Sequence, residues 1–207
     1  MPTTCATADA PELRTSSRER ILDAATQLFA ANGYENTSTL SIARAAGTSE
    51  TQVMKKFVNK QGLLEAVFGE VLGKMEELLN EVQHCSSTRD SLREFFRRAI
   101  PWLNDNPAFG KALLLDMRRI RSKNGGEVLS VPGAMPFLQQ LDDMLDQARE
   151  AGQLKCTMRS PVIRSALFGA IGELLRDPLV RQESSSSSAT PDEITEMLDY
   201  LLSCFFV

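Results

Sequence analysis

Apolar residues recur along the chain with the three-to-four-residue spacing of an amphipathic helix, and no stretch alternates as a half-buried strand requires. Near the N-terminus, Ser16 and Glu19 have the spacing of a capping box, a reciprocal pair of hydrogen bonds that opens a helix. One apolar helical face follows, made of Ile21, Leu22, Ala25, Leu28 and Phe29. The pattern therefore predicts a first helix that ends near Gly33, where a left-handed residue is expected.

Two short helices are predicted next, joined by a tight turn. The first is capped by Thr37 or Ser38 and ends at Gly47. The second opens with a capping box at Ser49 and ends near Phe57. Two helices of about two turns each, joined by a short turn that contains glycine, form a helix-turn-helix.

The rest of the chain is also predicted to be helical. A long apolar stripe follows Asn59, a candidate N-cap, and runs for roughly six turns. Further helices are expected over 88–105, 107–121 and 134–151, and two more at Ser160-Pro161 and Thr190-Pro191, where a cap residue precedes proline. The expected fold class is therefore all-α with about nine helices, an N-terminal three-helix helix-turn-helix domain followed by a C-terminal helical bundle.

Charge is distributed unevenly along the 207 residues, of which 43% are hydrophobic and 24% charged, with a formal net charge of −4. Residues 14–60 hold seven basic and four acidic residues, a net charge of +3. Residues 61–207 hold 16 basic and 21 acidic residues, a net charge of −5. A basic N-terminal face on an acidic protein favours a nucleic-acid partner for that face.

Several kinds of chemistry are excluded by what the sequence lacks. His84 is the single histidine, so neither paired imidazoles nor a multi-histidine metal site can form. No G-x-G-x-x-G, Walker or G-x-S-x-G motif occurs. The four cysteines show no C-x-x-C pairing, no apolar run reaches roughly 18 residues, and no secretory signal opens the chain. We therefore expect a cytoplasmic protein that is not an enzyme, with no cofactor, metal or membrane contact.

The second helix of the predicted helix-turn-helix carries candidate nucleic-acid contacts. In such a motif this helix enters the major groove of DNA while the first helix crosses the backbone. Gln52, Lys55 and Lys56 share one helical face, away from the apolar Val53 and Phe57. Lysine neutralises phosphates or donates to guanine, and glutamine can bind adenine through two hydrogen bonds. This face is predicted to contact DNA, with a solvated surface as the simpler alternative.

One ungapped stretch carries a specific motif: R-x-x-I-L-x-A-A-x-x-L-F-x-x-x-G-[YF], then T-[ST]-x-x-x-I-A-x-x-A-G-x-S, then a short helix and F-x-x-K-x-x-L. The chain meets this pattern at Arg18, Ile21, Leu22, Ala24, Ala25, Leu28, Phe29, Gly33, Tyr34, Thr37, Ser38, Ile42, Ala43, Ala46, Gly47, Ser49, Phe57, Lys60 and Leu63. The stretch resembles the DNA-binding region of TetR-type transcriptional regulators. The resemblance implies an all-α regulator that binds DNA through its helix-turn-helix.

The resemblance also implies which residues contact DNA. These are Thr37, Ser38, Ser49, Thr51, Gln52, Met54, Lys55, Lys56 and Lys60. The family usually ends its recognition helix with L-Y-x-H-F, where this chain has Val53-Met54-Lys55-Lys56-Phe57. Met54 lacks the tyrosine hydroxyl and is expected to pack against the helix pair, while Lys56 replaces histidine with a permanent cation. Glu50 adds an acid beside the groove, so no operator preference is carried over from the family.

The last two predicted helices have the composition of a subunit interface, because apolar residues cover more of their surface than one core contact needs. The candidate interface residues are Ala166, Gly169, Ala170, Leu174, Met197, Leu198 and Leu201. Two such helices from each of two subunits would form a four-helix interface around a two-fold axis. The alternative is that both are ordinary core helices of a monomer.

The middle helices carry apolar residues that predict an effector cavity. The candidate lining residues are Phe95, Trp102, Phe109, Leu113, Met117, Phe137, Leu141, Met144 and Phe168. A mostly apolar pocket with a few polar groups suits small-molecule recognition, while core packing is the alternative for each residue. Arg118, Arg119 and Arg121 are candidates for holding an anionic ligand, with a solvated face as the alternative.

Together these features predict a homodimeric prokaryotic transcriptional regulator, nucleoid-associated when bound. We expect a repressor of a pseudo-palindromic double-stranded DNA operator, released by a small-molecule effector. The expected parts are a flexible tail over 1–15, a helix-turn-helix DNA-binding domain over 16–60, and an effector-binding and dimerisation domain over 61–207. The helix over 60–84 enters both domains and is the predicted lever. Two alternatives are a ligand-responsive helical interaction module without specific DNA binding and a helical hydrolase, and activation instead of repression stays open within the main prediction.

Overall fold

The computed structural model describes residues 16–111, 134–181 and 189–207. Within these ranges the chain forms nine helices and no strand, apart from one isolated antiparallel bridge between Leu154 and Phe206. In chain order the helices are α1 (Ser17–Asn36), α2 (Thr39–Ala45), α3 (Glu50–Phe57), α4 (Lys60–Val82), α5 (Thr88–Asp105), α6 (Pro107–Lys111), α7 (Ala134–Glu150), α8 (Ser160–Arg181) and α9 (Pro191–Phe205). The all-α prediction is confirmed. The predicted tail over 1–15 and residues 112–121 of the helix predicted over 107–121 lie outside the described residues.

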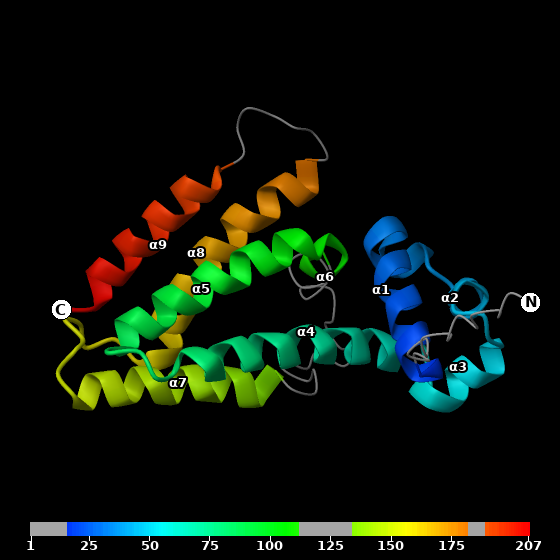
Figure 1. The fold of residues 1–207 in the computed structure, drawn as a ribbon, viewed down its shortest axis with the longest axis horizontal. Helices are drawn as coiled ribbons and strands as arrows, with labels where there is room; N and C mark the ends of the chain where they lie inside the picture. The colour runs from blue at the N-terminus through cyan, green and yellow to red at the C-terminus, as the bar shows by residue number, and fades with distance from the viewer. Residues whose placement is uncertain (1–15, 112–133, 182–188) are drawn as a thin grey trace, which may run out of the picture.

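The molecule is elongated, with α1, α2 and α3 gathered at one end and the remaining helices forming a bundle (Figure 1). The helix α4 leads from α3 into the bundle and packs against α1, α3, α5 and α7. The bundle is completed by α8, which packs on α7 and α9, and by contacts between α5 and α9. No candidate for a membrane span occurs among the helices that the structure describes.

The first helix opens and bends where local chemistry dictates. Ser16 makes the predicted capping box: its side chain accepts from the backbone N–H of Glu19, whose carboxylate accepts from the N–H of Ser16 at 2.7 Å. Gly33 has φ +77° and ψ 161°, so the backbone kinks there. The helix nevertheless continues beyond the kink to Asn36, three residues past its predicted end.

The turn between α2 and α3 is closed by a glycine in the left-handed region. Gly47 has φ +63°, and its N–H donates to the carbonyl of Arg44 while that of Thr48 donates to Ala43. This pair of bonds is a Schellman motif, which satisfies the last carbonyls of α2. Ser49 then caps α3 by accepting from the N–H of Gln52 at 3.3 Å. The turn therefore forms as predicted, whereas only the Ser49 half of the capping box predicted with Gln52 is present.

A single hydrophobic core runs through both ends of the molecule, from Ile21 in α1 to Phe206 after α9. The helix α4 joins the two ends because its predicted apolar stripe is buried along its whole length, from Leu63 to Val82. Because α4 packs against helices at both ends of the molecule, a displacement of α4 at one end also moves its contacts at the other end.

Candidate nucleic-acid interface and ligand cavity

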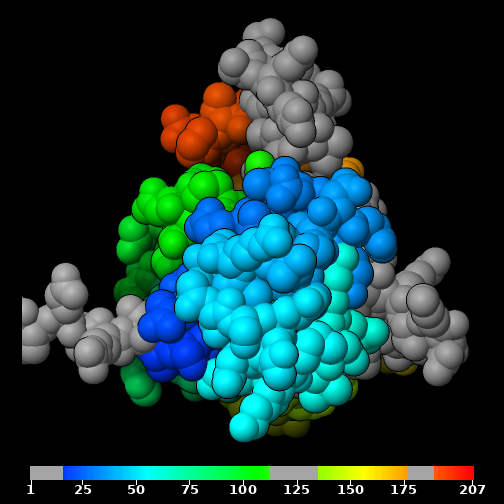
Figure 2. Space-filling model, turned by 90° about the vertical axis from the view of Figure 1, so that its right-hand side faces the viewer, coloured from blue at the N-terminus to red at the C-terminus, as the bar shows by residue number. Residues whose placement is uncertain are grey.

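The face of α3 predicted to contact DNA lies in solvent. Gln52, Lys55 and Lys56 are exposed, while Val53 and Phe57 on the opposite side are 1% and 6% exposed. Figure 2 shows this end of the molecule face-on, with α2, α3 and the start of α4 covering its centre. The exposure of these three residues is as predicted, and their contact with DNA stays a prediction.

The C-terminal end of α3 is held in place by Arg18 of α1. The Arg18 guanidinium lies 5.7 Å from the centroid of the Phe57 ring, within cation–π range. Its Nη1 also donates to Oε1 of Glu70 in α4 at 3.1 Å. One side chain of α1 therefore contacts both α3 and α4, which orients the exposed face of α3 relative to the rest of the molecule.

The junction between α3 and α4 is unusually tight. Val58 has φ +65°, and across it the N–H of Asn59 donates to the carbonyl of Phe57 at 2.7 Å. The Asn59 side chain then caps α4 by accepting from the N–H of Gly62 at 2.7 Å. A Cβ at Gly62 would lie 2.3 Å from the Phe57 carbonyl oxygen, so this position requires glycine. The start of α4 is thereby fixed against the end of α3.

Two residues predicted to contact DNA, Thr37 and Lys60, have contacts within the protein instead. Thr37 is 2% exposed, and its hydroxyl donates to the carbonyls of Leu28 at 3.1 Å and Gly33 at 2.9 Å. Thr37 is therefore a structural residue, and its prediction as a DNA contact is wrong because the fold turns its side chain inward. Ser38, the alternative cap, is exposed and caps α2.

Lys60, which was also predicted to contact DNA, packs against the end of α1. Its Nζ lies 4.2 Å from the centroid of the Tyr34 ring and donates to the carbonyl of Glu35 at 3.3 Å. These contacts hold the first residue of α4 against the end of α1. Burial, together with the carboxylates of Glu35 and Glu65, raises the pKa of the Tyr34 phenol. Lys60 thus serves the packing of α1 on α4 in this structure.

The remaining predicted contacts on α3 and its cap are exposed. Ser49 and Thr51 lie in solvent, and Met54 is 40% exposed instead of packing against the helix pair as expected. A contact that sequence reasoning missed lies beside them: the Thr39 hydroxyl donates to Oε1 of Glu50, which links the first residues of α2 and α3. Both residue types were visible in the sequence, but their pairing depends on the angle between two helices.

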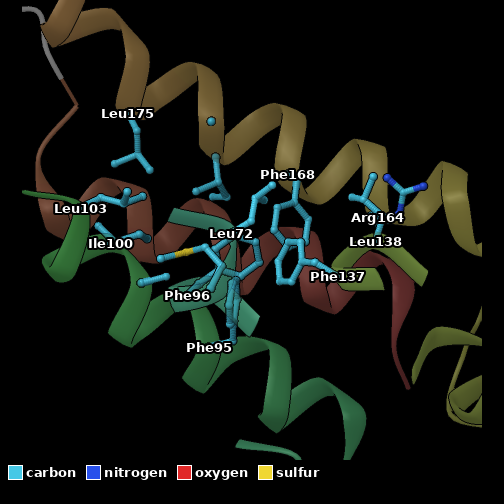
Figure 3. Close-up of a pocket in the computed structure, with 14 residues that line it drawn as sticks. Leu72, Phe95, Phe96, Ile100, Leu103, Phe137, Leu138, Arg164, Phe168 and Leu175 are labelled. Atoms are coloured by element: carbon cyan, nitrogen blue, oxygen red, sulfur yellow. The ribbon is translucent and has the colours of Figure 1, made fainter. Parts of the chain in front are cut away.

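A cavity of about 240 Å³ lies between α4, α5, α7 and α8 (Figure 3). Phe95, Phe137 and Phe168 line it, as predicted. They form a cluster with Phe96: the ring centroids of Phe96 and Phe168 are 4.9 Å apart, and those of Phe95 and Phe137 are 6.1 Å apart. The walls are almost entirely apolar, which suits an apolar ligand group.

Four other residues predicted to line the cavity lie elsewhere. Trp102 and Phe109 stack on each other with centroids 5.7 Å apart, Leu141 is buried in the core at 1% exposure, and Met144 borders a separate polar groove. These predictions are wrong because apolar residues on different faces of one helix meet different neighbours. Leu113 and Met117 lie outside the described residues, as do the three arginines proposed for an anionic ligand, Arg118, Arg119 and Arg121.

Most of the cavity wall was missed from the sequence. The additional lining residues are Leu72, Met75, Phe96, Ala99, Ile100, Leu103, Leu138, Arg164, Ile171, Gly172 and Leu175. Helical spacing was the available signal on α5, where these positions continue the face of Phe95. No comparable signal marks Arg164, whose place on the wall depends on how α8 packs against α7.

The residues predicted for a subunit interface fall into three groups by their exposure. Ala166, Gly169 and Met197 are exposed on α8 and α9, and Ala170, Leu174 and Leu201 are half-buried. Leu198 is only 2% exposed and packs inside its own subunit, so it has no surface to offer a partner and its prediction is wrong. Two large apolar side chains were missed on these helices, Val162 at 45% and Tyr200 at 63% exposure.

Comparison with known proteins points to the same N-terminal region. Residues 21–67 match the family model described as bacterial regulatory proteins, tetR family. The uncharacterized HTH-type transcriptional regulator YvkB of Bacillus subtilis is 33% identical over 131 residues, which cover 53% of this chain and 69% of that protein. The fatty acid metabolism regulator protein of Bacillus subtilis is 22% identical over 180 residues, which cover 86% of this chain and 92% of that protein.

The fold is also that of a solved regulator. The crystal structure of the transcriptional regulator FadR from Bacillus subtilis in complex with stearoyl-CoA matches with a TM-score of 0.73 at 19% identity, covering 89% of this chain and 95% of that chain. The matched proteins are transcriptional regulators and not enzymes, which confirms the expectation that this chain is not an enzyme.

Proposed function

The chain belongs to the tetR family of bacterial regulatory proteins and is a DNA-binding transcriptional regulator, and we propose that it binds a pseudo-palindromic operator as a homodimer. The observation that carries this proposal is the two-sided character of α3. Val53 and Phe57 anchor the helix in the core, while Gln52, Lys55 and Lys56 lie exposed at one end of the molecule. This arrangement suits insertion of α3 into the major groove.

The exposed side chains of α3 have different roles in this proposal. Lys55 and Lys56 neutralise phosphates or donate to guanine, so operator affinity falls as the salt concentration rises. Gln52 presents both a donor and an acceptor and reads an adenine edge. The uncapped N–H groups at the start of α3, beside Ser49, bind a phosphate. We propose that residues 16–60 form the DNA-binding domain and that residues 61–207 form the effector-binding and dimerisation domain.

The second subunit is proposed to dock on α8 and α9. Ala166 and Gly169 on α8 are exposed and small, which permits close approach of another helix, and Met197 and Tyr200 on α9 are exposed and large. A two-fold axis through this surface pairs α8 and α9 with the same helices of the partner, as in a four-helix bundle. In this proposal the two copies of α3 lie at the spacing of successive major grooves.

The effector is proposed to occupy the cavity and to release the operator, so that the protein acts as a repressor. The FadR structure of similar fold holds stearoyl-CoA, and the apolar walls here support a ligand with an apolar chain. Two routes lead from the cavity to α3: α4, which carries the lining residues Leu72 and Met75, and α6, which packs against α1. A ligand that prefers a state with different positions of α4 and α6 shifts the population away from DNA.

Selection from a random DNA pool at low salt tests this function directly. The wild type is expected to enrich an inverted repeat, and Lys56→Ala to bind the enriched site more weakly with a salt slope smaller by about one. Lys74→Ala is the matched control, since it removes the same charge from α4, away from the proposed DNA-contacting face, and is expected to leave the slope unchanged. If no sequence is enriched, operator binding is contradicted and the interaction-module alternative is favoured.

A further inference from the structure

The cavity ends at a paired cation. Among the described residues that line it, Arg164 alone is charged, and Figure 3 shows it at the opposite end from Leu103 and Leu175. Its Nε donates to Oδ1 of Asp142 at 2.8 Å and its Nη2 to Oδ2 at 3.2 Å. The two side chains are only 18% and 16% exposed. The polar end of the cavity is therefore a partly buried ion pair with no net charge.

The pairing still leaves hydrogen-bond donors available. A guanidinium carries five N–H groups in a fixed plane, and the bidentate contact with Asp142 uses Nε and one hydrogen of Nη2. The hydrogens of Nη1 and the second hydrogen of Nη2 can donate to another acceptor. A ligand oxygen that reaches one of these hydrogens accepts a hydrogen bond while the pair with Asp142 stays intact.

The charge of Asp142 decides which oxygen is accepted. A ligand carboxylate would bring a second negative charge beside Asp142 in a site that is largely removed from water, where like charges repel strongly. A neutral carbonyl accepts from Arg164 without that repulsion and loses less hydration on entering. The pair therefore discriminates by charge and not by shape.

We propose that the cavity selects ligands in which an apolar chain ends in a neutral carbonyl, as in an acyl ester or thioester, and rejects the corresponding free carboxylates. This inference rests on the proposed role of the cavity as the effector site. The carbonyl oxygen accepts from Arg164, and the chain lies past Phe168 and Phe137 toward Leu103. The cavity volume of about 240 Å³ exceeds that of the roughly 150 Å³ engineered cavity that holds benzene. Asp142 is the specificity-determining residue.

Methyl octanoate and octanoate form a matched pair of probes, because at pH 7 they differ chiefly in charge at the carbonyl end. Binding to the full-length protein is measured for each by calorimetry. Methyl octanoate is expected to bind the wild type about tenfold more tightly than octanoate. In Asp142→Asn, Arg164 becomes an unpaired cation, and the ratio is expected to fall by about tenfold or to reverse. Asp143→Asn removes the same charge from the next, exposed residue of α7 and is expected to leave the ratio unchanged.

Three outcomes overturn the inference: octanoate binding the wild type as tightly as the ester, an unchanged ratio in Asp142→Asn, or neither octanoyl probe binding. Propylbenzene carries no oxygen, so its binding does not depend on Arg164 or Asp142. It therefore distinguishes a failure of the proposed carbonyl selectivity from a failure of the proposed effector site. If propylbenzene binds, the effector role of the cavity stands, and if none of the three probes binds, both proposals fail. Should Asp142→Asn not fold, the double variant with Arg164→Gln leaves no unpaired charge. Methyl octanoate is expected to bind this double variant about tenfold more weakly than it binds the wild type, and propylbenzene is expected to bind both equally. An unchanged affinity for methyl octanoate contradicts the proposal.

Discussion

Gly110 of α6 lies directly against the backbone of Leu103 in α5, so closely that a Cβ at Gly110 would be 3.2 Å from the Leu103 carbonyl oxygen. The Leu103 side chain forms part of the cavity wall, and α6 packs against α1 of the DNA-binding end. Two successive contacts therefore connect the cavity with the helix that supports α3. This route runs beside α4, the lever that the sequence predicted.

Gly110→Ala is expected to displace α6 by a few tenths of an ångström, because the added methyl group meets backbone and not a flexible side chain end. We expect operator affinity without ligand to fall about fivefold, and added ligand to cause a smaller further loss than in the wild type. Fluorescence anisotropy on the selected operator measures both. Equal affinity and an equal ligand effect in wild type and variant would show that α6 does not transmit the signal.

Gly62 and Gly73 lie on the same helix and are expected to respond oppositely to alanine. A Cβ at Gly62 would be 2.3 Å from the Phe57 carbonyl oxygen, whereas one at Gly73 meets nothing within 4 Å. Gly62→Ala should therefore destabilise the protein by about 3 kcal/mol or more. Gly73→Ala should stabilise it by up to about 1 kcal/mol, because alanine favours the helix interior. Urea unfolding compares the two, and loss of stability in Gly73→Ala would contradict the packing described for α4.

Thr37→Val replaces a buried hydroxyl with a methyl group of similar shape. Since the hydroxyl donates to the Leu28 and Gly33 carbonyls, we expect a loss of about 1 kcal/mol in the free energy of unfolding. Operator affinity of the folded protein should not change, because the side chain is 2% exposed. A variant with wild-type stability and weakened operator binding would restore Thr37 as a DNA contact.

Gly169→Arg tests the proposed subunit interface. Gly169 is exposed, and a Cβ there meets nothing within 4 Å, so an arginine is accommodated within the subunit. Placed between two packed helices it prevents their approach, and sedimentation is expected to show a folded monomer with weakened operator binding. Gly73→Arg on α4 is the control, since a Cβ at Gly73 likewise meets nothing within 4 Å, and it should leave the dimer intact. A dimeric Gly169→Arg would place the interface elsewhere.

Glu94 makes part of the stability dependent on pH. Hydrogen bonds from Arg97 and Arg98 lower the pKa of its carboxyl from 4.5 to about 2. Because the folded pKa lies below the unfolded one, this stabilisation is complete above about pH 4.5 and is lost as the pH falls through about 2. The difference in unfolding free energy between wild type and Glu94→Gln should therefore shrink over this window. The effect is modest, since surface pairs contribute little, and a difference that is constant from pH 7 to pH 2 would contradict it.

The positions of the helices could be predicted because their determinants are local. Ser16, Ser49, Asn59 and Thr190 each accept from a backbone N–H three residues ahead, and such contacts depend only on the sequence at hand. Gly47 likewise ends α2 through its own backbone conformation. The exposed side of α3 follows from the same helical period, and so the candidate DNA-contacting face was found without the structure.

Only the tertiary structure decided which apolar residues surround a cavity and which polar groups are already occupied. Trp102 and Phe95 lie on the same helix, yet one stacks on Phe109 and the other faces the cavity, because helix crossing angles determine what each face meets. The pairing of Arg164 with Asp142 joins residues 22 positions apart on two helices. Helix periodicity is a property of neighbouring residues, whereas a cavity and its charge are properties of how distant helices pack.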